Sequence, residues 1–368
     1  MGKSEKIGKW VLTVFLQIVL VFMIFSSVEG TLAFCLNHPN VLTKFKITRD
    51  FFRGYYINRD RNIVQYSPQW AVYSHSLSYT LKPGRFIFSN REFSVAYEVN
   101  KLGVRDDNDS LNSPEIVVIG DSQAMGWGVN QDDTFTQLIE KRCGVRVLNA
   151  AVSSYGTARE MRLLERIDTS KLKYLIIQYA DNDYEENLKY YNSNNSLPIM
   201  GEAEYNNLVN TYLLARQRYY GKITISMADY ILRKIILKIE KKAPPDNQGI
   251  TSNEDDDTMK NNQVDDADLF LNVLTTSKTD LSSTHIIVVE VNSYGRQDHF
   301  IDLLKEKISA GRYPDYIKNI AAIDLSTGFK KSDFYILDDH MNEYGHRYIA
   351  ETIINRMNNL TGEPICRR

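Results

Sequence analysis

The fold is decided by residues 114–129, which read PEIVVIGDSQAMGWGV. Within this stretch, residues 116–119 are apolar and mostly β-branched, and a proline and a glycine bound them, which predicts a fully buried strand. Gly120 and Asp121 are typical of a tight turn, so Ser122 is expected where the chain begins a helix. The carboxyl ends of strands in an open α/β sheet form the crevice in which ligands bind. We therefore expect Ser122 in the functional site.

Strand and helix patterns alternate after this stretch. Strands are expected over 116–119, 145–148, 174–179, 285–291 and 320–325, and helices over 132–142, 158–167, 296–309 and the closing amphipathic stretch. Strands this close in sequence need helical crossovers. The sequence therefore predicts an α/β domain over 113–368, with a parallel sheet and helices on both faces.

The N-terminus carries a targeting signal. Three lysines within residues 1–9 precede an apolar run over 10–28, which is long enough to span a bilayer. The positive-inside rule then places residues 1–9 in the cytoplasm and the rest of the chain outside the cytoplasmic membrane, in a periplasmic or similar space. A cleaved signal peptide ending before Thr31 is the alternative.

Residues 29–112 are expected to form a lead-in region outside the main domain. Basic and aromatic residues interleave over 42–63, and we expect this segment to rest on lipid headgroups or on the domain. Nucleic acid is disfavoured as a partner because the net charge is −2 and the pI is near 6.3. Residues 79–105 are expected to be extended and poor in strands.

The stretch 243–268 is acidic and almost free of apolar residues, which predicts a solvated insertion in the main domain. Just before it, apolar residues recur on one face of a helix, and core packing is expected for them over membrane contact. These residues are Ile231, Leu232, Ile235, Ile236 and Ile239.

Four stretches place polar groups at the ends of predicted strands: Ser122, the turn 149–156, Asn182 and the loop 338–340. A hydroxyl, an imidazole, a carboxylate and oxyanion donors are the groups that acyl transfer needs. This chemistry requires no cofactor. A metal site is not expected, because the chain lacks CxxC and HExxH spacing and its acidic run lacks the pattern of a calcium loop.

These motifs resemble those of the SGNH hydrolases, also called GDSL-type esterases and lipases. GDSQ at 120–123 matches the first family block and places Ser122 at the nucleophile. NAAVSSYGT matches the second block, with Ala151 at the usual glycine, and Asn182 in ADND matches the third. His340 in DDHMNEYGH matches the last block. The resemblance implies a three-layer, flavodoxin-like fold with Ser122, Ala151 and Asn182 as oxyanion donors.

The last block departs from the common family pattern, because Leu337 occupies the position of the usual aspartate three residues before the histidine. Side chains two residues apart on an extended segment share a side, so Asp338 is expected to orient His340, with Asp339 as the alternative. A D-x-H arrangement also occurs in membrane-associated relatives that handle acetyl groups on extracellular polysaccharides. His346 is expected to have a packing role.

Together these features predict a membrane-anchored serine esterase that removes acyl groups, acetyl above all, from an envelope glycan or a related ester. Two alternatives stay open: an O-acetyltransferase that uses the same residues, and a noncatalytic glycan-binding module on a degenerate SGNH fold. A disulfide between Cys143 and Cys366 is also predicted, because the first and last helices of such a sheet lie side by side and the compartment is oxidising.

Overall fold

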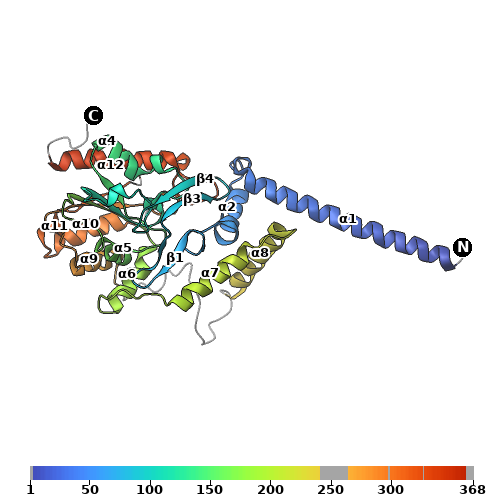
Figure 1. Cartoon of the computed structure of the whole chain (residues 1–368). Coiled ribbons are helices and arrows are strands. Elements are labelled where there is room, and N and C mark those ends of the chain that lie inside the picture. Colours follow the sequence, from blue (N-terminus) through green and yellow to red (C-terminus); the bar gives the residue numbers. More distant parts are fainter. Residues whose placement is uncertain (1–2, 241–263, 297–298, 326, 362–368) are drawn as a thin grey trace. The chain divides into compact units, whose positions relative to one another are not determined.

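The computed structural model describes residues 3–240, 264–296, 299–325 and 327–361 (Figure 1). The chain falls into two compact units. The smaller unit draws on Met1–Arg61, Leu214–Ser252 and Ile336–Asp338. The larger unit draws on Asn62–Leu213, Asn253–Tyr335 and Asp339–Arg368. Most of the predicted insertion at 243–268 lies outside the described residues, and its last residues cap and begin the helix α9 (Asp266–Thr276).

A parallel sheet of five strands forms the centre of the larger unit. Its spatial order is β6 (Val147–Asn149), β5 (Ile116–Ile119), β7 (Tyr174–Tyr179), β8 (His285–Glu290) and β9 (Ala321–Ile323). Every neighbouring pair is parallel. The predicted α/β fold with a flavodoxin-like parallel sheet is therefore confirmed.

Alternation along the buried strands divides the core between the two faces of the sheet. On β5, Val117 and Ile119 face one apolar cluster, and Ile116 and Val118 face the other. The first cluster is covered by α5 (Thr157–Leu164), α9, α10 (Phe300–Ala310) and α11 (Asp315–Lys318). The second is covered by α3 (Ser122–Met125), α4 (Phe135–Cys143) and α12 (Glu343–Thr361), and α4 and α12 lie side by side in Figure 1. The larger unit also contains α6 (Asp183–Asn192), and α7 (Glu202–Arg216) begins in it.

The expectation that residues 79–105 are poor in strands is wrong. Two antiparallel hairpins occupy this region and the residues before it: β1 (Ala71–Ser74) with β2 (Ser78–Leu81), and β3 (Gly84–Ser89) with β4 (Ser94–Val99). On β4, Val95, Tyr97 and Val99 are buried in alternation and join the core beneath Trp127. Burial of these side chains in the core explains why the segment pairs into hairpins.

The smaller unit contains α1 (Lys3–Asn37), α2 (Lys46–Tyr55) and α8 (Lys222–Glu240). Residues 7–37 of α1 are long and apolar enough to cross a membrane, and a signal sequence would pass the same test. The basic and aromatic segment after α1 forms α2, whose Phe52 and Tyr55 are buried in a small core with Met227 of α8.

The expected core packing of the apolar residues at the end of α8 is wrong. Ile231, Leu232, Ile235, Ile236 and Ile239 are between 42% and 63% exposed. The residues of α8 that do enter the core, Met227 and Tyr230, lie on a different face of the helix.

Two of the three cysteines lie in the described part of the chain. Cys143, at the last residue of α4, is disulfide-bonded, and Cys35 is a free thiol. Cys366, the partner predicted for Cys143, lies outside the described residues.

Candidate active site

Ser122 lies at the first residue of α3, directly beyond β5. The turn between the strand and the helix is closed by Asp121, whose carboxylate accepts a hydrogen bond of 2.8 Å from the backbone N–H of Gln123. Gly120 is required here because a Cβ at this position would come within 2.7 Å of Ala124 Cβ and 2.8 Å of Gln178 Oε1. The turn therefore holds the Ser122 hydroxyl at the carboxyl end of β5.

His340 lies against this hydroxyl although 218 residues separate the two in sequence. Its Nε2 is 2.7 Å from Ser122 Oγ. The imidazole stacks on the Trp127 ring, with the ring centroids 4.7 Å apart and the planes within 16°. The backbone carbonyl of His340 accepts a hydrogen bond from the N–H of Tyr335. The larger unit thus brings a serine hydroxyl and an imidazole into hydrogen-bond contact, the spacing that a nucleophile and a general base would need.

Asp339 lies on the other side of the His340 ring, with its Oδ1 3.2 Å from Nδ1. Its Oδ2 accepts a hydrogen bond of 3.0 Å from Ser293 Oγ, and its backbone carbonyl accepts one from the N–H of Tyr294. The residues after β8 therefore fix the loop that carries the histidine.

Asp338 is fully buried. Within the smaller unit, its Oδ2 accepts a hydrogen bond of 2.7 Å from Tyr56 Oη, and its Oδ1 lies 3.5 Å from Arg61 Nη1. Within the larger unit, the Asp339 carboxylate is near enough to act on the imidazole, and a divalent ion bound there would compete with its hydrogen bond from Ser293.

The proposed oxyanion donors lie at two further strand ends. The N–H of Ala151 points to Asn149 Oδ1 at 3.2 Å, so the side chain of this buried asparagine occupies it. Asn182 is exposed, lies between β7 and α6, and its side chain forms a hydrogen bond with Asp121. An incoming oxyanion would have to draw both donors from these carboxylate and amide oxygens.

Gln123 is a site residue that the sequence patterns did not single out. Its Oε1 accepts a hydrogen bond of 3.2 Å from the N–H of Met341, and its Nε2 lies 3.5 Å from the backbone oxygen of Asp339. The residue next to the nucleophile therefore ties α3 to the histidine loop. Only its place directly after the serine could have indicated this role in advance.

Electrostatics separate the two histidines near the site. Burial, followed by the positive charges of Arg105 and His340, lowers the pKa of His346 to about 3. Its Nδ1 accepts a hydrogen bond of 3.2 Å from the N–H of Phe135, and its ring stacks on the Phe135 ring. A buried imidazole with a lowered pKa and these contacts packs α12 against α4, which agrees with the expected packing role of His346.

Buried carboxyl groups lie behind the serine turn. Burial raises the pKa of Asp121 to about 6, while the Gln123 hydrogen bond and the charge of His340 act to lower it. Burial, followed by the charge of Asp183, raises the pKa of Glu160 well above its usual value. Neither carboxyl oxygen of Glu160 has a hydrogen-bond partner among the described residues. The sequence did not predict this group, because its members are brought together only by the packing of α5 and α6.

Two solved structures are similar to this chain. One, from Desulfitobacterium hafniense DCB-2, is described as a lipolytic protein of the G-D-S-L family: it is 12% identical, the TM-score is 0.31, and the match covers 64% of this chain and 97% of that protein. The other, from Bacteroides ovatus ATCC 8483, is described as a GDSL-like lipase: it is 11% identical, the TM-score is 0.34, and the match covers 67% of this chain and 53% of that protein. No family model and no curated protein sequence matches the chain.

Proposed function

We propose that this protein is a serine hydrolase of the SGNH type that cleaves ester bonds. The distance of 2.7 Å between Ser122 Oγ and His340 Nε2 is the observation that carries the proposal. A serine hydroxyl is a weak nucleophile unless an adjacent base takes its proton, and this contact supplies the base. The buried Trp127 ring and the Asp339 carboxylate both contact this imidazole, which limits its movement.

In the proposed reaction, Ser122 Oγ attacks the ester carbonyl while its proton passes to His340 Nε2. The N–H groups of Ser122 and Ala151 and the side-chain amide of Asn182 bind the tetrahedral oxyanion. His340 then gives the proton to the leaving alcohol, which departs and leaves an acyl ester on Ser122. A water molecule, deprotonated by His340, repeats these steps in reverse order and releases the acid.

Asp338 is proposed as the carboxylate that holds the imidazolium. Its complete burial and its hydrogen bonds from Tyr56 and Arg61 keep its pairing oxygens fixed, which favours an orienting role. Asp339 is the alternative, supported by its 3.2 Å approach to Nδ1. Its other oxygen accepts a hydrogen bond from Ser293, so this carboxylate is held in place as well.

The proposed substrates are acyl esters, acetyl esters above all, on a glycan or related carrier outside the cytoplasmic membrane. This proposal depends on α1 being an anchor and on the resemblance of the D-x-H loop to envelope members of the family. If the acyl group passes to a sugar hydroxyl in place of water, the same residues would make the protein an O-acetyltransferase. Net gain of acetyl by a glycan incubated with an acetyl donor would identify transfer, and net loss would identify hydrolysis.

The replacement Ser122→Ala tests the proposed function. The release of p-nitrophenol from p-nitrophenyl acetate should fall by roughly 10⁴- to 10⁶-fold, because the acyl acceptor is gone. Labelling by a fluorophosphonate probe should disappear as well. Ser309→Ala, at an exposed position of α10, is the matched control and should keep both. Wild-type protein that is folded by circular dichroism and yet unlabelled at Ser122 would support the noncatalytic module instead.

A further inference from the structure

The first half of α8 has one face that packs within the smaller unit. Met227 and Tyr230 are buried there with Tyr55 of α2, and Tyr55 Oη lies 2.6 Å from Ser226 Oγ. Ile223 lies against the same core. These residues recur at intervals of three and four, so they define a single face of the helix.

The N-terminus of α8 is attached to α1. The Glu29 carboxylate accepts hydrogen bonds from the N–H of Ile223 at 3.1 Å and from the N–H of Thr224 at 2.7 Å. Just before α8, the Tyr220 ring stacks on Phe22 of α1 at 5.6 Å and contacts Phe25 at 5.8 Å. The beginning of α8 is therefore fixed beside the last third of the apolar stretch of α1.

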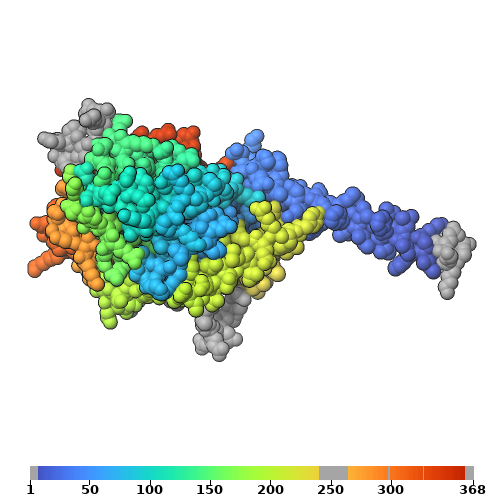
Figure 2. Space-filling view, viewed as in Figure 1, coloured from blue at the N-terminus to red at the C-terminus, as the bar shows by residue number. Residues whose placement is uncertain are grey.

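The opposite face of α8 is apolar and uncovered. Its residues follow one another at intervals of three and four along the whole helix, and all are exposed: Ile225, Ala228, Ile231, Leu232, Ile235, Ile236 and Ile239. In Figure 2 the yellow atoms of α8 form part of the open surface. Apolar patches this long are rare on soluble proteins and mark a contact with another apolar phase.

We propose that this face of α8, defined as the exposed apolar residues from Ile225 to Ile239, lies in the lipid bilayer beside α1. The inference rests on α1 crossing the membrane and is independent of the proposed reaction. Residues 20–24 of α1 are between 53% and 66% exposed, so apolar surface continues from α1 through Tyr220 to α8.

The polar residues of α8 and the residues before it agree with this location. Lys238 borders the apolar face and is exposed, as expected for a side chain that reaches anionic headgroups. Lys234 lies on the packed side, with its Nζ 4.8 Å from the centre of the Tyr230 ring. Tyr219 and Tyr220 are more than half exposed next to α1, and tyrosine is enriched where hydrocarbon meets water. The helix thus has the composition of an interfacial helix, which inserts its apolar face into the bilayer surface and does not cross the membrane.

Lipid quenching of a fluorophore on α8 tests this inference in the full-length protein. The variant Ile236→Cys, made with Cys35→Ser and labelled with bimane, is placed in phosphatidylcholine and phosphatidylglycerol vesicles brominated on the acyl chains. Phe15→Cys in α1 is the membrane reference, and Lys305→Cys on the exposed face of α10 is the aqueous control. Quenching at Ile236 should approach that at Phe15 and exceed that at Lys305 several-fold.

Quenching at Ile236 as weak as at Lys305 would overturn the inference. Disulfide cross-linking of Ile236→Cys between two copies, without quenching, would assign the face to a second copy of the chain instead. Absent quenching at both Phe15 and Ile236 would also overturn it, because α8 cannot lie beside a span that does not exist. Loss of esterase activity in Ser122→Ala has no bearing on these signals, so the two proposals fail separately.

Discussion

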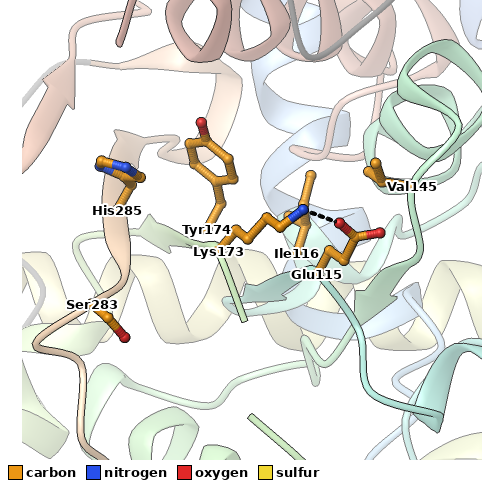
Figure 3. Close-up of a pocket in the computed structure, with 7 residues that line it drawn as sticks. All are labelled: Glu115, Ile116, Val145, Lys173, Tyr174, Ser283 and His285. Atoms are coloured by element: carbon orange, nitrogen blue, oxygen red, sulfur yellow. Dashed lines mark hydrogen bonds and ion pairs between the residues drawn. The ribbon is translucent and has the colours of Figure 1, made fainter. Parts of the chain in front are cut away.

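The two ends of the central sheet each contain a serine and a histidine, but they differ in how these side chains are placed. At the carboxyl end, Ser122 and His340 are joined by a hydrogen bond, and the buried Trp127 ring stacks on the imidazole. The amino end has a pocket of about 280 Å³ (Figure 3), lined by Glu115, Ile116, Val145, Lys173, Tyr174, Ser283 and His285. This pocket also contains a serine and a histidine, yet Figure 3 shows the Ser283 hydroxyl directed away from the His285 ring.

This comparison shows that a cavity with a serine and a histidine in its lining does not bring the two side chains into contact; the backbone must place them. In the pocket, Lys173 Nζ turns to the Glu115 carboxylate, and the His285 ring stacks on Tyr174. At the carboxyl end, Ser122 directly follows β5 and begins α3, whose N-terminus has free N–H groups, and His340 lies against its hydroxyl. Four predictions would break or sharpen this comparison.

The largest expected effect comes from replacing His340, at the carboxyl end, by alanine and comparing it with the same replacement of His285 in the pocket. His340→Ala should lower ester turnover by roughly 10⁴-fold or more, because Ser122 loses its base. His285→Ala should leave turnover within about twofold of wild type. The initial rate of p-nitrophenyl acetate cleavage measures both. A comparable loss in His285→Ala would place the reaction at the pocket of Figure 3 and refute the assignment to the carboxyl end.

A smaller effect is expected from the two aspartates before His340. Asp338→Asn should reduce turnover by about 10³- to 10⁴-fold with little change in KM, since an amide cannot stabilise the imidazolium that forms in the transition state. Asp339→Asn should cost about tenfold, through the Ser293 and Nδ1 contacts. Thermal unfolding of each variant separates loss of orientation from loss of fold. A larger loss in Asp339→Asn would reverse the two roles.

The buried carboxyl group of Glu160, behind the serine turn, predicts that the stability of the fold depends on pH. The folded-state pKa of Glu160 is raised above the ordinary 4.5, so the folded protein binds the proton more tightly than the unfolded chain does. Stability should therefore decline as the pH rises above about 4.5, and Glu160→Gln should remove this part of the decline. At pH 8 the variant should be more stable by about 1–3 kcal/mol, and near pH 4 it should match wild type.

Urea unfolding at the two pH values measures this difference. Glu115→Gln, at the solvent-accessible amino end, is the control and should show no comparable change. A Glu160→Gln variant that is less stable than wild type at pH 8 would mean that the carboxylate has a favourable partner in solution.

The smallest effect is expected at the ion pair in the pocket. Lys173 and Glu115 side chains are 65% and 28% exposed, and pairs in such settings contribute little. Lys173→Met should change the free energy of unfolding by less than about 1 kcal/mol and should leave ester turnover unchanged. A shift of several kcal/mol would show that the amino end has a structural importance that its exposure conceals.

Much of the sheet and part of the candidate site could be predicted from the sequence. The buried strands are continuous apolar runs, and such runs are easily recognised. The expected limits of β7 agree with the structure, and those of β5 do too, since both are buried on both faces. Ser122 and His340 could be named from their motifs. Gln123 and Trp127 could not, because their contacts with the histidine loop exist only after 200 residues of chain have folded between them.

Two failures of prediction have a common physical cause. The hairpins β1 to β4 and the exposed face of α8 both depend on what covers an apolar residue, and periodicity does not reveal this. On β4, Tyr97 lies between Ala96 and Glu98 in a short strand, and the sequence does not show that its ring is buried in the core. On α8, apolar residues occur on two faces, and only the structure shows that Met227 is covered and Ile236 is not.

The hydrogen bonds that hold Asp338 have a practical consequence for producing the protein. Tyr56 and Arg61 come from the segment that directly follows α2, well before the first strand of the sheet. A soluble version that begins at Asn62 would keep all five parallel strands and lose both of these donors. A version that begins at Phe45 would omit α1 and retain them. If Asp338 orients His340 as proposed, the choice of first residue would then decide whether the purified protein keeps the proposed activity.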